Sequence, residues 1–156
     1  MSIFTDIKEL TGGKRKSKDW YRNQLMWGLE DYTGGFRPGD IIFFNYSAAT
    51  EKLLFWDTHP MVFISSTNMK TGHFEGGNLH YLRPSARKTV ANMWSAGGMA
   101  YPTRCHHKYF ISNATNVKVV KPIDLQNMTP LPVEQFVLRS VGRVIQVPSS
   151  FIWSRV

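Results

Sequence analysis

Three neighbouring residues of this 156-residue chain have side chains that commonly carry chemistry. Cys105 is followed directly by His106 and His107, and a thiol beside an imidazole can serve as a nucleophile or as a metal ligand. Adjacent residues point in different directions on a regular element, however, and zinc ligands are usually paired with roughly two to four residues between them. We therefore predict no metal site and no cofactor here, and interpret the cluster as a surface loop.

Acidic residues are too sparse to favour metal-assisted hydrolysis. Residues 83–156 contain only Asp124 and Glu134, whereas a Mg²⁺-dependent nuclease usually needs several carboxylates. Asp40, Asp57 and Glu75 lie in the first half, where we interpret them as turn-capping and loop residues. The sequence also lacks a Gly-x-Ser-x-Gly elbow and a Gly-x4-Gly-Lys phosphate loop. We therefore predict no catalytic residues and no enzymatic activity.

The basic residues give a stronger signal. Residues 1–82 hold 9 Lys and Arg against 9 Asp and Glu, whereas residues 83–156 hold 10 against 2, so the whole net charge of +8 lies in the second half. A second, local cluster follows Thr11-Gly12-Gly13. This pattern suits contacts with phosphates or with acidic protein surfaces. The predicted contact residues are Lys14, Arg15, Lys16, Lys18, Arg22, Arg83, Arg87, Lys88, Arg104, Lys108, Arg139 and Arg143.

The elements that must position these residues are short. Ser17 precedes apolar residues at helical spacing, which predicts an N-cap and a helix that runs until Gly34-Gly35. Pro84 and Pro132 are typical of helix starts, and the predicted helices cover residues 84–94 and 132–137. The predicted strands cover residues 41–46, 61–64, 78–82, 108–111, 117–120 and 144–147. The apolar run at residues 61–64 indicates a strand that is buried on both faces.

These elements predict an α+β fold, either a small SH3-like β-barrel or a curled antiparallel sheet, with about three flanking helices. Residues 1–36 would form an N-terminal basic segment and helix, and residues 37–156 a single barrel-based domain. In the expected strand 78–82, Asn78 and His80 share one face. If that face is buried, the two side chains must belong to a satisfied polar network, and we favour this structural role over an active site.

One motif string covers much of the first half. It runs Arg37-Pro38-Gly39-Asp40 to Tyr46, then Phe55-Trp56-Asp57-Thr58-His59-Pro60-Met61-Val62, then Gly72 to Pro84 with Arg87. The string resembles tailed-phage virion proteins of the DNA end protector (head completion) family of T-even-type bacteriophages. Its most specific part is Asn78-Leu79-His80-Tyr81-Leu82, and residues 131–136 match a later element loosely. The shared structural residues are Gly39, Asp57, Pro60, Asn78, His80 and Tyr81.

The resemblance implies a protein that caps DNA termini inside the phage head, protects them from host exonuclease after ejection and completes the head for tail attachment. It also implies partners among other virion subunits (portal, neck or tail) and double-stranded DNA, an oligomer within the virion, and synthesis in the host cytoplasm. Two departures are that family members are longer and that His59 replaces an apolar residue before the proline. No apolar stretch approaches the roughly 20 residues of a membrane span, so no membrane partner is expected.

A second resemblance concerns Pro38-Gly39-Asp40-Ile41-Ile42 and His59-Pro60-Met61-Val62-Phe63-Ile64-Ser65. These segments are similar to ribonuclease toxins of the MazF type, which are SH3-like barrels. In those toxins an arginine before the proline is functional, and here His59 takes that place. Three hypotheses follow: a non-enzymatic head-completion or DNA end-protecting protein; a tail, neck or baseplate subunit without DNA contact; and a barrel nuclease using His59, His80 or Asp57.

Overall fold

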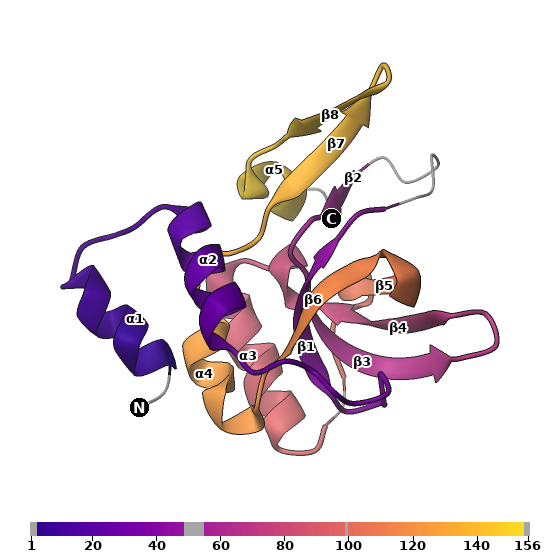
Figure 1. The fold of residues 1–156 in the computed structure, drawn as a ribbon, viewed down its shortest axis with the longest axis horizontal. Helices are drawn as coiled ribbons and strands as arrows, with labels where there is room; N and C mark the ends of the chain where they lie inside the picture. Colours follow the sequence, from indigo (N-terminus) through magenta and orange to yellow (C-terminus); the bar gives the residue numbers. More distant parts are fainter. Residues whose placement is uncertain (1–2, 49–54, 99, 155–156) are drawn as a thin grey trace.

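The fold is built on two antiparallel sheets, seen in the computed structural model, which describes residues 3–48, 55–98 and 100–154 (Figure 1). The larger sheet has the strand order β5-β4-β3-β1-β6 and the smaller one the order β2-β7-β8. The strands are β1 (Ile41–Tyr46), β2 (Phe55–Asp57), β3 (Met61–Asn68), β4 (His73–Asn78), β5 (His106–Phe110), β6 (Ala114–Val119), β7 (Phe136–Ser140) and β8 (Arg143–Gln146). The helices are α1 (Ile3–Thr11), α2 (Lys18–Gly28), α3 (Pro84–Ser95), α4 (Leu125–Met128) and α5 (Ser149–Trp153), with short 3₁₀ turns η1 (Leu79–Tyr81), η2 (Thr103–Cys105), η3 (Ile111–Asn113) and η4 (Pro122–Asp124).

The α+β class is confirmed. Of its two predicted forms, the closed barrel is not found among the described residues, because the strands remain in two separate sheets. The helices in the described ranges also exceed the predicted number. None of them is long and apolar enough to cross a membrane.

Strand β1 and the first half of β3 are buried on both faces of the larger sheet, as the apolar run at residues 61–64 predicted for β3. Ile41 and Phe43 of β1 pack with α1, α2, α3 and α4 in one core, while Ile42 and Phe44 face a second core. The second core also includes Trp56 of β2 and Val137 of β7, so the smaller sheet covers part of the other face. Successive residues of a strand point to opposite faces, which explains why such a strand has no polar alternation.

Local signals placed two helices correctly at their N-terminal ends. The Ser17 side chain accepts a hydrogen bond from the Trp20 amide, 3.2 Å away, so it caps α2 as predicted. Pro84 occupies the first turn of α3, where its missing N–H costs nothing. The C-terminal end of α2 was predicted too late, because the helix stops at Gly28 and residue 31 joins β6 through an isolated bridge to Lys118.

Two predicted elements are wrong. Residues 78–82 do not form a strand, because β4 ends at Asn78 and the Asn78 side chain accepts a hydrogen bond from the His80 amide, which caps the turn η1. Residues 132–137 do not start a helix, because Phe136 begins β7 and pairs with Asp57 of β2. Tertiary pairing with a strand far away in the sequence overrides the helix signal of Pro132 in this segment.

The N-terminal segment shares the main core with the rest of the chain. Phe4 and Ile7 of α1 and Tyr21 and Leu25 of α2 are buried in the same cluster as Phe136. Residues 3–36 therefore pack on the predicted 37–156 unit and do not stand apart from it. The β7–β8 hairpin behaves differently, since it projects from the body of the molecule (Figure 1).

Candidate functional site

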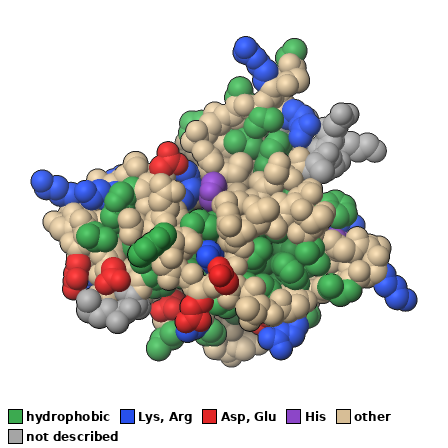
Figure 2. All heavy atoms as spheres, in the orientation of Figure 1, with side chains coloured by type: hydrophobic (Ala, Val, Ile, Leu, Met, Phe, Trp, Pro, Cys, Tyr) green, Lys and Arg blue, Asp and Glu red, His purple; other side chains and the backbone are tan. Residues whose placement is uncertain are grey.

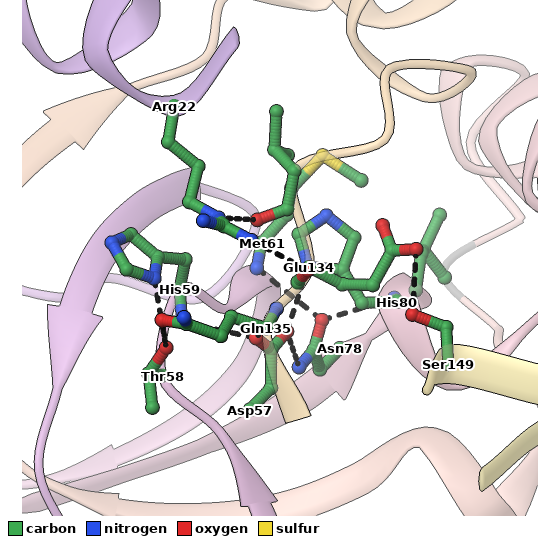
Figure 3. Close-up of polar contacts among 12 residues, drawn as sticks. Arg22, Asp57, Thr58, His59, Met61, Asn78, His80, Glu134, Gln135 and Ser149 are labelled. Atoms are coloured by element: carbon green, nitrogen blue, oxygen red, sulfur yellow. Dashed lines mark hydrogen bonds and ion pairs between the residues drawn. The ribbon is translucent and has the colours of Figure 1, made fainter. Parts of the chain in front are cut away.

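A buried polar network lies where the two sheets meet, and Asp57 is at its centre (Figure 3). Asp57 Oδ2 accepts hydrogen bonds from Asn78 Nδ2 at 3.0 Å and from His80 Nδ1 at 2.7 Å. Its Oδ1 accepts from the amides of His59 and Gln135, both at 3.0 Å. One carboxylate therefore ties the end of β2 to the β4–η1 junction and to the segment before β7. The predicted polar pair of Asn78 and His80 is confirmed as part of a buried network.

The electrostatics of this carboxylate favour its ionised form. Burial acts to raise the Asp57 pKa, but the His80 charge and the hydrogen bonds from His80, Asn78 and the Gln135 amide outweigh it and hold the pKa at about 2. An ionised carboxylate can only accept hydrogen bonds, so His80 carries a proton on Nδ1. The side chains of Asp57 and His80 are each 1% exposed, which closes this pair to any substrate in this conformation.

A second set of charges surrounds Glu134 next to this network. Glu134 Oε1 accepts from Lys18 Nζ and from Ser149 Oγ, each at 2.9 Å, and Lys18 Nζ also lies 2.9 Å from Ser149 Oγ. On the other side, Arg87 Nη2 is 3.3 Å from Glu134 Oε2. Burial acts to raise the Glu134 pKa, but His80, Arg87 and Lys18 together lower it. The cluster thereby joins α2, α3, α5 and the segment before β7.

Two predicted contact residues are wrong because they are buried. Arg87 is 0% exposed, and its guanidinium donates to the carbonyls of Leu79, Leu82 and Thr129. Arg22 is 4% exposed, and it donates to the carbonyl of Val133 at 2.9 Å and forms an ion pair with Asp19. A rigid fork of donors suits this arrangement, in which several carbonyls from different segments are satisfied by one side chain.

His59 is half-buried beside the Asp57 network. Thr58 Oγ1 donates to Gln135 Oε1 at 2.7 Å and lies 2.8 Å from His59 Nδ1. The hydroxyl has only one proton, so it accepts from His59 Nδ1–H, and His59 Nε2 carries a lone pair. Burial, with the charges of Arg22 and His80, lowers the His59 pKa to about 4 against the opposing effect of Asp57. The ring is therefore neutral at pH 7.

The Cys105 cluster shows no activated nucleophile. Cys105 is 0% exposed, and burial raises the pKa of its thiol to about 11, so the thiol stays protonated at neutral pH. His106 Nδ1 lies 2.7 Å from the Tyr101 hydroxyl, and the His107 ring stacks on Tyr81 at 4.3 Å. Within the described ranges, no three His, Cys, Asp or Glu side chains are placed to hold a metal ion.

Two predicted contact residues, Lys18 and Arg83, touch the short helix α5. Lys18 contacts Ser149 at its start, and the Arg83 guanidinium lies 5.6 Å from the ring centre of Trp153 at its end. The exposed residues Lys14, Arg15 and Lys16 lie in the loop just before Lys18. We call Lys14, Arg15, Lys16, Lys18 and Arg83 the α5 basic surface. The structure thus joins two groups of cations that the sequence showed only as separate clusters.

The other predicted contact residues are more scattered. Lys88 is exposed on α3, Arg104 is partly exposed in η2 and Lys108 is exposed on β5. Arg139 is half-buried, since its guanidinium lies 5.3 Å from the Trp56 ring centre and donates to the Ala48 carbonyl. Arg143 is exposed on β8. Figure 2 shows one face of the molecule, on which blue side chains extend from its periphery and from the projecting hairpin.

The structural motif residues have clear local roles. Gly39 adopts φ 96° in the turn before β1, where its amide donates to the Ile64 carbonyl at 2.9 Å, and a left-handed residue there favours glycine. Pro60 is buried immediately before β3, where no strand hydrogen bond from its nitrogen is needed. Tyr81 is buried between His107 and Phe136.

Sequence reasoning missed the central role of Glu134, Ser149 and Gln135. A usable signal existed for Glu134, because it is one of only two acids in the basic half of the chain. Ser149 and Gln135 carried no such signal, since their partners are far away in the sequence. In comparisons with known proteins, neither a family model nor a curated protein nor a solved structure matches this chain.

Proposed function

We propose that the protein is a non-enzymatic virion structural protein of the head-completion or DNA end-protecting type, which contacts duplex DNA through its α5 basic surface. The proposal is supported by Lys18 and Arg83, which both contact α5, and by the exposed cations of the loop just before Lys18. Among the described residues, none forms an ion pair with Lys14, Arg15, Lys16 or Arg83. Exposed cations without acidic neighbours suit phosphate contacts, which need no base recognition.

The acidic residues of the chain support this choice of surface. Asp31 and Glu30 pair with Lys118 and Lys121, at 2.5 and 2.8 Å, so those lysines are locally neutralised. Glu134 is buried under the α5 basic surface and is itself paired with Lys18 and Arg87. The surface around α5 therefore keeps a positive charge, whereas the edge of β6 does not.

The motif string at residues 37–87 supplies the phage part of the proposal. The alternative of a tail, neck or baseplate subunit uses the same basic surface against acidic neighbours. The alternative of a MazF-like nuclease is less favoured, because two of its three candidate residues, Asp57 and His80, are 1% exposed. Of the three candidates, only His59 is partly exposed, and the Asp57 and His80 side chains near it are buried.

The direct test is binding of linear duplex DNA measured by fluorescence anisotropy over a series of salt concentrations. Replacing Lys16 and Arg83 together by Gln removes two cations of the α5 basic surface. We expect weaker binding and a slope of log K against log salt that is smaller by about 2, since each phosphate contact contributes close to one counterion.

The matched control is the Lys70→Gln/Lys121→Gln variant, which loses the same charge at exposed sites away from α5. It should keep the slope of the unchanged protein. Absence of duplex binding at low salt contradicts the DNA contact and leaves the subunit-packing alternative. Where binding is seen, slower digestion of linear duplex by an exonuclease, with no effect on circular duplex, distinguishes end protection from general coating.

A further inference from the structure

The β7–β8 hairpin presents an open sheet edge. In the strand order β2-β7-β8, β8 pairs only with β7, and Figure 1 shows the hairpin extending away from the main body. All four residues of β8 are exposed. An edge strand carries unpaired N–H and C=O groups, which makes it a template for another strand.

The register shows which backbone groups are unpaired. The amide of Val147 donates to the carbonyl of Phe136 at 3.0 Å, and the next pairs along the hairpin are Val137 with Gln146 and Leu138 with Ile145. Hydrogen-bonded pairs alternate in an antiparallel ladder, so Ile145 and Arg143 bond to β7. The N–H and C=O groups of Val144 and Gln146 therefore point out of the open edge.

The side chains along this edge are unusually apolar for an exposed strand. Val141 at the tip is 98% exposed, Val144 is 55% exposed and Ile145 is 44% exposed. The edge strands of natural sheets are commonly protected by charged side chains, proline or a bulge. Within β8, Arg143 is the only charged residue, and the strand contains no proline. An apolar edge with free hydrogen-bonding groups favours a β-strand as its occupant.

The same edge is complementary to itself. If a second copy of β8 runs antiparallel with Ile145 on the two-fold axis, Val144 lies opposite Gln146 of the second copy, and the reverse pair forms by symmetry. Both residues of each pair have outward N–H and C=O groups, so two hydrogen-bonded pairs form. Arg143 then lies opposite Val147 of the second copy, which avoids contact between like charges.

Other centres of symmetry fit less well. Centring on Gln146 places Val144 opposite Pro148 of the second copy, which has no N–H to donate. Centring on Val144 places Gly142, a turn residue with φ 72°, in a ladder position. The register centred on Ile145 is the one in which both hydrogen-bonded pairs lie within β8.

We propose that β8 is a homodimer interface, in which two copies pair antiparallel about Ile145 and join their three-stranded sheets into one continuous sheet. The interface does not depend on DNA binding.

The proposal is tested by cross-linking through introduced cysteines. Ile145 forms a non-hydrogen-bonded pair with its own copy, where Cα atoms are about 4.5 Å apart, which is within disulfide range. The Ile145→Cys variant should therefore form a disulfide-linked dimer under mild oxidation, seen by non-reducing electrophoresis and intact mass. The native Cys105 is 0% exposed and does not compete.

The matched control is Val144→Cys, whose thiol lies opposite Gln146 of the second copy and should remain uncross-linked. Efficient cross-linking of Val144→Cys instead of Ile145→Cys overturns the register. Equal lack of cross-linking in both variants overturns the interface.

Sedimentation velocity of the protein without introduced cysteines measures its oligomeric state independently of cross-linking. The unchanged protein should show a concentration-dependent monomer–dimer equilibrium, and Val144→Thr, which keeps the outward N–H, should retain it. Val144→Pro removes that N–H without removing a bond to β7, so it should shift the protein to monomer. A monomer at every concentration for the unchanged protein, or a dimer that survives Val144→Pro, contradicts the proposal.

Discussion

The polar network around Asp57 and Glu134 buries charged and polar side chains, whereas the β7–β8 hairpin exposes apolar side chains to solvent. The network holds polar and charged side chains in the interior, with Asp57 and His80 each 1% exposed, whereas the hairpin holds Val141 in solvent at 98% exposure. These groups contact one another across six segments of the chain, which they hold together. The hairpin's exposed groups have no such partners among the described residues, which points to an interaction outside the chain.

The strongest test of the network is the loss of Arg87. The Arg87→Met variant leaves Glu134 buried with Lys18 as its remaining ion-pair partner and removes the guanidinium hydrogen bonds to the carbonyls of Leu79 and Leu82. We expect the free energy of unfolding in urea to fall by about 3–5 kcal/mol. The double variant Arg87→Met/Glu134→Met removes both charges and should be more stable than Arg87→Met alone. A double variant that is no better than the single one would show that the carbonyl contacts dominate.

The next effect concerns acid stability. The folded Asp57 pKa of about 2 lies below its ordinary value of 3.8, so the unfolded chain binds more protons between these values. Stability therefore falls as pH drops from about 4 to about 2, by roughly 2 kcal/mol in total. Asp57→Asn should lower stability at pH 7 by a similar amount and flatten this pH window in urea unfolding. The exposed Glu9→Gln is the control, and an unchanged acid profile in Asp57→Asn would contradict the assignment.

The smallest expected effect is a change in stability at the tip of the β7–β8 hairpin. Val141 has φ 47° and Gly142 has φ 72°, which defines a two-residue turn with a β-branched residue in the left-handed region. Val141→Asn should raise monomer stability by about 1 kcal/mol, measured by thermal unfolding at low protein concentration, because asparagine tolerates this backbone better. Val144→Asn, on extended backbone, should give no such gain. Destabilisation by Val141→Asn would mean that the tip packs on its own chain.

Local features of the sequence were sufficient for much of the fold. The Ser17 cap, the Pro84 helix start and the apolar run at residues 61–64 act through neighbouring residues, and each was found where it was expected. The helix expected at Pro132 failed because pairing of β7 with β2 decides that segment. The strand expected at 78–82 failed because an asparagine side chain caps a turn there.

The candidate site was harder to predict because its contacts are long-range. Arg22 and Arg87 were assigned to the surface, since charged residues are rarely buried unless they are paired. Their partners, including Glu134, come from distant segments and cannot be read from spacing. Asn78 and His80 were correctly expected in a polar network, but the central carboxylate, Asp57, was found only from the fold.

The attachment of α5 has a consequence for how the chain acquires its structure during synthesis. Ser149 contacts Lys18 and Glu134, and the Trp153 indole donates to the carbonyl of His80 at 2.9 Å. Contacts between such distant residues close large loops, which slows folding. Residues 149–153 must therefore leave the ribosome before Lys18 can gain its contact with Ser149 and before the His80 carbonyl can gain the Trp153 indole.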